Sequence, residues 1–186
     1  MAWDHIVVGA GSAGCVLAHR LVRAGRRVLL LEAGGPDRSP WLRLPVGYFR
    51  TIYDPRFSRV FEVEPQPETG ERRIPWPRGR ILGGSSSING LLYIRGQHED
   101  YDDWARRGAT GWSYRELLPY FRRSERYDGP ASEYHGTEGE LGVSELRNDD
   151  PSCLAWLEAA QQYGLPANAD FNAASSHGVG PYQLTI

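Results

Sequence analysis

Three glycines near the N-terminus have the spacing of a phosphate-binding turn. Gly9, Gly11 and Gly14 fall between a short β-branched run and a helical pattern. In that setting the first glycine permits a tight turn, the second lets a pyrophosphate approach the backbone, and the third lets helix and strand pack closely. The helix then begins at Ser12 and Ala13, whose N–H groups are free to donate to phosphate. The pattern predicts a dinucleotide-binding turn.

A carboxylate follows at a distance that suits a ribose. Glu32 lies eighteen residues after Gly14, at the end of a second apolar run. There it can accept hydrogen bonds from both ribose hydroxyls, and it would repel a phosphate on that ribose. These residues leave NAD and FAD as alternatives. They also leave a plain structural alternative, in which the glycines only make a turn and Glu32 is a surface charge.

A second glycine segment raises the question of what lies against it. The stretch "ILGGSSSING", residues 81–90, holds three glycines and three consecutive serines among apolar residues. A flexible Gly/Ser linker is rarely bracketed by residues of the buried type. We therefore expect another group to approach this bare backbone closely. The structural alternative is a glycine turn packed on a sheet.

The elements that position the first site can be predicted from periodicity. Residues 6–8 form a β-branched run typical of a strand buried on both faces, and residues 28–31 form a second apolar run. Between them, apolar residues recur at three- and four-residue spacing from 13 to 24, and Gly25 ends the helix. Two parallel strands need a crossover of this kind. The fold class is therefore α/β with a βαβ start.

The rest of the chain predicts less regular structure. Eight prolines between residues 34 and 79 predict irregular covering segments, with a turn or two of helix at 42–49 and two short edge strands within 61–76. Two short helices are expected within 98–127, the second capped by Ser113 and Glu116, and a third at 151–163. Four tryptophans are expected in the core: Trp76, Trp104, Trp112 and Trp156. For Trp76, just before the glycine-serine stretch, the alternative is that it covers a cofactor.

Composition excludes several classes of protein. The chain has 186 residues and a net charge of −2, with acidic and basic residues interspersed, so nothing points to nucleic acid. All 21 basic residues are Arg, which removes any Schiff-base lysine. Two Cys and five dispersed His predict neither a disulfide framework nor a metal site. The start is not that of a signal peptide and no apolar run is long enough for a transmembrane segment, so we expect a cytoplasmic protein.

The glycine and serine motifs together resemble those of a known family. The segment "WPRGRILGGSSSINGLLYIRGQHEDYDDW" closely resembles the flavin-side signature of the glucose-methanol-choline (GMC) oxidoreductases. The openings "DHIVVGAGSAGCVLAHRL" and "VLLLEAGG", and the later "YHGTEGELGVSEL" and "DFNAASSHGVGPYQLT", are similar to that family too. The resemblance covers essentially the whole chain. It implies a Rossmann-like FAD-binding fold with a parallel sheet. Residues 1–186 would be the N-terminal part of the FAD-binding domain, without its later strands and most of the substrate domain.

The resemblance also implies which residues bind FAD. Gly83 and Gly84 would supply donors beside the diphosphate and flavin, and Leu92 and Tyr93 would lie near the isoalloxazine ring. Ile88 occupies the position at which some members carry a histidine that attaches the flavin, so FAD is expected to be non-covalent. The full set of expected cofactor-binding residues is Gly9, Gly11, Ser12, Ala13, Gly14, Glu32, Ala33, Arg80, Gly83, Gly84, Ser85, Asn89, Gly90, Leu92 and Tyr93.

The activity implied is oxidation of an alcohol, with hydride transfer to flavin N5 and proton removal by a histidine. That histidine belongs to a part of the family that this sequence does not contain, so no catalytic residue is expected here. The chain alone is expected to be inactive and poorly stable, with its missing half supplied in cis or in trans.

Two other functions stay open. The chain could belong to a NAD-dependent dehydrogenase, in which a bulky residue at Gly84 would leave nucleotide binding untouched, or it could be the nucleotide-binding half of a split enzyme. Peripheral membrane association of the intact protein stays open as well.

Overall fold

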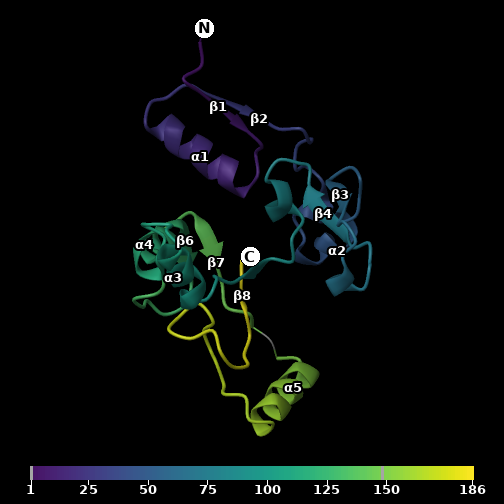
Figure 1. Cartoon of the computed structure of the whole chain (residues 1–186), viewed down its shortest axis with the longest axis vertical. Coiled ribbons are helices and arrows are strands. Elements are labelled where there is room, and N and C mark those ends of the chain that lie inside the picture. Colours follow the sequence, from purple (N-terminus) through teal and green to yellow (C-terminus); the bar gives the residue numbers. More distant parts are fainter. Residues whose placement is uncertain (1, 148) are drawn as a thin grey trace. The chain divides into compact units, whose positions relative to one another are not determined.

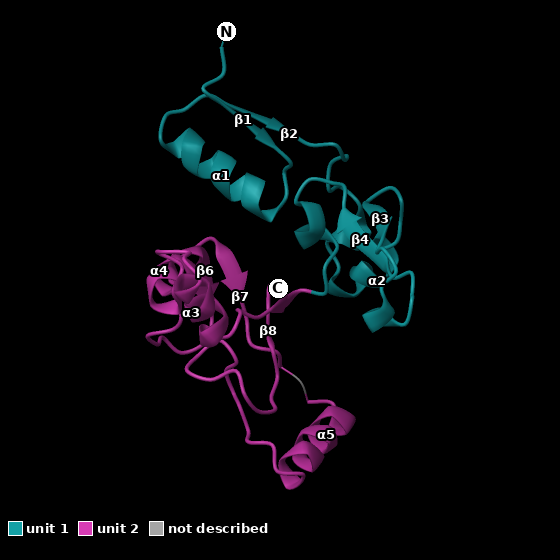
Figure 2. Cartoon of the chain, viewed as in Figure 1, with its two compact units in different colours: residues 1–90 teal, residues 91–186 magenta. Residues whose placement is uncertain are grey.

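The chain consists of two compact units. A computed structural model describes residues 2–147 and 149–186. Residues 1–90 form the first unit and residues 91–186 the second (Figure 2). None of the helices in the described residues is long and apolar enough to span a membrane.

The first unit opens with the predicted strand, helix and strand. Strand β1 (His5–Val8) leads into helix α1 (Ser12–Arg23), and strand β2 (Val28–Leu31) follows (Figure 1). The two strands pair in parallel, with His5 opposite Val28 and Val8 opposite Leu31. Gly25 follows the helix with a φ of 76°, a conformation that favours glycine. The predicted βαβ start is therefore confirmed.

The burial expected for the first strand is wrong. Val7 is buried, but Ile6 is 61% and Val8 is 82% exposed. Among the described residues this sheet contains only β1 and β2, and α1 packs against both. A parallel strand is covered on both faces only when helices or further strands lie on each side of it. The apolar residues of β1 are thus typical of a strand buried on both faces, but the described residues bury only part of it.

The proline-rich part forms short elements around an antiparallel ribbon. Two 3₁₀ turns, η1 (Pro40–Leu42) and η2 (Pro45–Gly47), precede the short helix α2 (Tyr48–Thr51). Strands β3 (Ser58–Glu62) and β4 (Pro75–Gly79) pair in antiparallel fashion. The 3₁₀ turns η3 (Pro67–Thr69) and η4 (Gly84–Ser87) follow β3 and β4 respectively. The turn or two of helix expected at 42–49 is present as 3₁₀ turns and the start of α2, which continues to Thr51. The two short strands are confirmed, although β3 begins earlier and β4 ends later than expected.

The second unit combines three helices with short strand pairs. Its elements are β5 (Leu92–Tyr93), α3 (His98–Arg106), α4 (Tyr114–Ser124), β6 (Glu125–Tyr127), β7 (Leu141–Val143), α5 (Pro151–Gln162) and β8 (Gln183–Leu184). Strand β6 pairs in parallel with β7, and β5 pairs in antiparallel fashion with β8. All three predicted helices are present, and Ser113 and Glu116 form the predicted capping box at the start of α4.

The tryptophans do not form the core. The four expected there are between 47% (Trp104) and 64% (Trp156) exposed, so that expectation is wrong. Trp104 and Trp112 lie 6.1 Å apart, centroid to centroid, and cover each other only partly. In units this small, large rings remain on the surface because few elements are available to enclose them.

The capping box at α4 gives a first test. We expect Ser113→Ala to lower the free energy of unfolding of the second unit by about 1 kcal/mol, because the capping box loses the hydrogen bond from Ser113 Oγ to Glu116 Oε2. Urea unfolding followed by circular dichroism measures this. Thr110→Ala, in the exposed loop just before the cap, is the control. Equal stability of the two variants would contradict the role of the cap.

Candidate nucleotide-binding site

Ten of the predicted site residues line one cleft in the first unit. It has a volume of about 960 Å³, and the glycine turn, the end of β2, the β3–β4 ribbon and the start of η4 contribute to it. Its lining comprises Val8, Gly9, Gly11, Ser12, Ala13, Gly14, Leu31, Glu32, Ala33, Arg59, Phe61, Arg78, Gly79, Arg80, Gly84 and Ser85. Its size is at the upper end of the range of about 300–1,000 Å³ found for small-molecule and cofactor pockets.

The first glycine turn is built for close backbone contact. Gly9 has a φ of 95°, and a Cβ added at Gly14 would lie only 1.9 Å from the carbonyl oxygen of Gly9. Helix α1 therefore approaches the end of β1 as closely as it does only because Gly14 has no side chain. This is the packing that the glycine spacing predicts.

The second glycine segment packs against the first. The Gly83 N–H donates to the carbonyl of Ala10 at 2.8 Å, and Gly83 and Gly11 form an isolated parallel bridge. A Cβ on Gly84 would lie 2.8 Å from the Cα of Gly11. The bare backbone of the glycine-serine segment therefore serves first to let two loops of the protein meet.

This packing corrects two expectations. The N–H of Gly83 is bonded to Ala10 and that of Gly84 to the carbonyl of Ile81, at 2.7 Å, so neither is a free donor for a ligand. A bulky residue at Gly84 would also press on Gly11 whichever nucleotide binds. Replacing Gly84 therefore does not distinguish a NAD enzyme from a flavin enzyme, contrary to what the sequence suggested.

Glu32 is held in place by the backbone at the edge of the cleft. Its Oε2 accepts from the N–H of Ala10 and its Oε1 from the N–H of Gly34, each at 2.8 Å. A carboxylate oxygen has two lone pairs, so each oxygen can accept one more hydrogen bond. The carboxylate is thus oriented and still able to bind two hydroxyl groups.

The start of α1 provides a positive end that faces the cleft. No side chain caps this helix, its first turn contains no acidic residue, and Ser12, Ala13 and Gly14 all line the cleft. Free N–H groups and the helix dipole favour an anion at such a position. An oriented carboxylate beside an uncapped helix start fits the ribose and diphosphate of a dinucleotide.

Five predicted residues do not line this cleft. Gly83, Asn89 and Gly90 are in the first unit but are not part of its lining. Leu92 and Tyr93 form β5 in the second unit, opposite Leu184 and Gln183. Their contact with a cofactor stays a prediction. Ile88 is 3% exposed.

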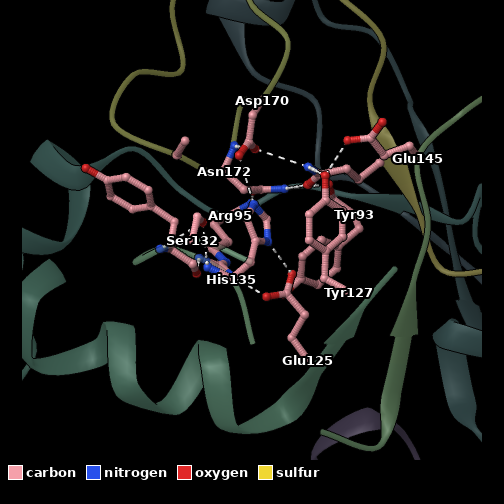
Figure 3. Close-up of polar contacts among 12 residues, drawn as sticks. Tyr93, Arg95, Glu125, Tyr127, Ser132, His135, Glu145, Asp170 and Asn172 are labelled. Atoms are coloured by element: carbon pink, nitrogen blue, oxygen red, sulfur yellow. Dashed lines mark hydrogen bonds and ion pairs between the residues drawn. The ribbon is translucent and has the colours of Figure 1, made fainter. Parts of the chain in front are cut away.

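A buried polar cluster in the second unit was missed by the sequence reasoning. Glu125 is fully buried: one oxygen accepts from Arg95 Nη2 at 2.9 Å and from the N–H of Gly136 at 2.8 Å, and the other lies 3.0 Å from His135 Nδ1 (Figure 3). His135 Nε2 lies 2.9 Å from Asp170 Oδ2. Arg95 lies 30 residues from Glu125 and His135 lies 35 residues from Asp170, so no local spacing marks the cluster.

The cluster holds strand β5 through an amide. Asn172 Oδ1 accepts from the backbone N–H of Arg95 at 2.7 Å, and Asn172 Nδ2 donates to the carbonyl of Tyr93 at 3.1 Å. Asn172 is in turn bonded to Gln183 on β8. A single buried side chain therefore fixes both the strand that contains Tyr93 and its partner strand.

The charges of the cluster depend on one another. Burial by itself lowers the pKa of His135, but its hydrogen bonds to Asp170 and Glu125 outweigh burial and raise the pKa to about 9. For Asp170, burial acts to raise the pKa, yet the hydrogen bond from His135 leaves that pKa below its ordinary value. His135 is therefore a cation at neutral pH, held between two carboxylates.

The glycine contact gives a second test. We expect Gly14→Ala to lower the free energy of unfolding by about 1–3 kcal/mol, because the new methyl group would overlap the Gly9 carbonyl and push α1 off β1. Gly35→Ala is the matched control, since a Cβ there meets nothing within 4 Å. Urea unfolding of both variants measures the difference, and equal stabilities would refute the close contact.

The pKa of His135 gives a third test. It rises from 6.5 to about 9 on folding, so the stability contributed by the charge is complete below about pH 6.5 and is lost as the pH rises through about 9. We expect urea unfolding to show a greater loss of stability between about pH 7 and pH 9.5 in the wild-type chain than in His135→Gln. His177→Gln, at an exposed position, should behave as wild type. The same pH dependence in all three chains would contradict the assignment.

Comparison with known proteins agrees with this geometry. The chain is 45% identical over 188 residues to oxygen-dependent choline dehydrogenase of Photobacterium profundum, a match that covers 99% of the chain and 33% of that protein. It is 43% identical to alcohol dehydrogenase [acceptor] of Pseudomonas putida, over 98% of the chain and 34% of that protein. The chain thus spans about a third of the length of these curated relatives.

Solved structures show the same fold. Pyridoxine 4-oxidase from Mesorbium loti matches with a TM-score of 0.92 and 33% identity, over all of this chain and 37% of that one. An FAD-dependent oxidoreductase from Chaetomium thermophilum matches with a TM-score of 0.84 and 29% identity, over all of this chain and 34% of that one. The GMC oxidoreductase family model matches residues 3–185. The chain therefore belongs to the GMC oxidoreductase family, whose structural neighbours are FAD-dependent flavoproteins.

Proposed function

We propose that this chain is the N-terminal, FAD-binding portion of a flavin-dependent oxidoreductase that acts on the CH–OH group of an alcohol. Its curated relatives are named for choline and alcohol dehydrogenation, and it matches about a third of their length. The single observation that carries the proposal is the packing of Gly83 and Gly84 on Gly11 at one cleft. It supports a site in which both glycine segments act together.

Each part of the cleft has a role in this proposal. The start of α1 binds the diphosphate, and the two oriented oxygens of Glu32 bind the ribose hydroxyls. Ala33 and Arg80 complete the nucleotide side of the site. Ser85 lines the cleft, and its Oγ accepts from the Gly79 N–H at 3.1 Å, which leaves its own O–H available to a cofactor. When bound, FAD supplies the acceptor for the hydride.

We propose that the segment after η4, residues 89–93, forms the flavin side of the site. We place Asn89 and Gly90 against the cofactor, with Leu92 and Tyr93 beside the ring system. The buried amide of Asn172 supports this role, since it bonds the carbonyl of Tyr93 and the N–H of Arg95. These hydrogen bonds with Asn172 fix the backbone of the strand that contains Leu92 and Tyr93.

The cofactor is proposed to be held without a covalent bond. Ile88 has an alkyl side chain, which has no atom that could attach a flavin, and it is buried within the first unit. Covalent attachment in this chain would therefore have to use a different residue.

No residue of this chain is proposed as the catalytic base. Of its five histidines, His135 is held as a cation between two carboxylates, which makes it a poor proton acceptor. We propose that the base and most of the alcohol site are provided by a further portion of the enzyme, in cis or in trans. The 186-residue chain alone would bind the cofactor without turning over substrate.

Flavin release is the decisive experiment. We expect the purified chain, supplied with FAD, to show flavin absorption, and the supernatant after acid precipitation to contain all of that flavin. A Glu32→Ala variant should lose most of the bound FAD, because the ribose loses both acceptors, whereas Glu68→Ala, on the exposed turn after β3, should not.

Three outcomes would count against parts of the proposal. Flavin that stays with the precipitate would contradict non-covalent binding. A chain that takes up NAD and no FAD would indicate a nicotinamide enzyme. Alcohol-dependent reduction of FAD by the chain alone would contradict the need for a further portion.

A further inference from the structure

The β3–β4 ribbon presents an unusual set of side chains on one face. In the antiparallel register Arg59 lies opposite Arg78, and Phe61 lies opposite Trp76. Directly opposite residues share a face, and so do residues two apart on one strand. These four side chains therefore form one surface, here called the arginine face.

The arginine face is arranged as two matching pairs. The guanidinium carbon of Arg59 lies 4.8 Å from the ring centroid of Phe61, and that of Arg78 lies 4.9 Å from the ring of Trp76. Phe61 and Trp76 are 47% and 48% exposed. Each cation is thus placed over a ring on its own strand, and both rings remain open to a ligand.

Arg59 and Arg78 place two like charges at directly opposite positions of the ribbon. Like charges directly opposite on paired strands repel. Within the described part of the chain no carboxylate forms an ion pair with Arg59, Arg78 or Arg80. By contrast Arg73, just before β4, pairs with Glu62 at 3.2 Å. The ribbon thus neutralises an arginine near its turn and leaves the arginine face unneutralised.

The arginine face borders the cleft already described. Arg59, Phe61 and Arg78 line it together with the glycine turn and Glu32. With Arg80, three arginines line a cleft whose only acidic lining residue within the described part of the chain is Glu32. The positive start of α1 lies in the same lining, so the cleft favours a ligand with more than one negative charge.

We propose that the arginine face binds the adenosine diphosphate half of the dinucleotide. Arg59 and Arg78 pair with phosphate oxygens, and the half-exposed ring of Phe61 receives the adenine ring, since bases stack on aromatic side chains. Trp76 does not line the cleft and acts by holding Arg78 in position. This inference rests on the proposed function, because the same cleft must hold a dinucleotide. It adds Arg59 and Phe61, which lie outside both glycine segments, and Arg78, which comes just before the second one.

Binding of ADP to the 186-residue chain tests the inference without flavin. We expect Arg59→Gln/Arg78→Gln to bind ADP about ten- to a hundredfold more weakly than wild type, because two charged hydrogen-bond donors are lost. Arg43→Gln/Arg72→Gln removes the same charge from exposed positions of the first unit outside the cleft, and should bind as wild type. Phe61→Leu should weaken ADP but not inorganic phosphate, whereas Phe49→Leu should change neither.

The salt dependence of ADP affinity provides a second measurement. The double variant should show a smaller loss of ADP affinity with rising salt than wild type, because fewer cations contact phosphate. Circular dichroism should show that it is folded, since replacing the two arginines removes a repulsion. Isothermal titration of ADP at two salt concentrations gives both quantities.

The outcomes separate this inference from the proposed function. FAD binding by wild type that is unchanged in the double variant, with the same salt dependence, would overturn the inference and leave the function intact. FAD binding without any ADP binding would also overturn it. ADP binding that depends on the arginine face, in a chain that takes up no FAD, would support the inference while the flavin function fails. Absence of both ligands would overturn both.

Discussion

The first unit depends on the contact between two loops that have no side chains where they meet. Gly14 lets α1 approach β1, and Gly84 lets the glycine-serine segment approach Gly11. The hydrogen bond from Gly83 to Ala10 joins these loops, and Ala10 also donates to Glu32. One short stretch of backbone therefore sets the position of the turn, the second loop and the carboxylate. Any added methyl group at Gly14 or Gly84 would have to move backbone, which is far less compliant than a side chain.

The second unit is held together in a different way. Its centre is a set of charges, in which Arg95 and His135 share Glu125 and His135 also reaches Asp170. Burying so many charged groups is costly unless they find partners. Backbone groups such as the Gly136 N–H supply some of these, although within the described residues Arg95 Nε is buried without a hydrogen-bond partner. The result is a rigid polar centre that fixes the short strands β5 and β8, which pair through only two residues each. Strands this short have little stability of their own.

Several apolar residues are exposed in this chain, which matches about a third of the length of its curated relatives. Ile6 and Val8 on β1 and Trp156 on α5 are more than half exposed, although their types suit a core. The curated relatives are about three times as long as the matched segment. The polar and glycine contacts described above are local to each unit, so they form without a large core. The sheet, by contrast, has apolar residues that its two strands and one helix do not cover.

The sequence by itself determined the features that depend on neighbouring residues. The βαβ order, the capping box at Ser113 and the ends of the helices follow from local periodicity and from glycine, whose conformational preferences act within a few residues. Only the tertiary structure decided what the glycine-serine segment contacts, that Arg59 faces Arg78, and that Glu125, His135 and Asp170 meet. These contacts join residues far apart in the chain, and their existence depends on pairing register and packing. The exposure of the tryptophans was misjudged for the same reason, because burial depends on what surrounds a residue and no local pattern records that.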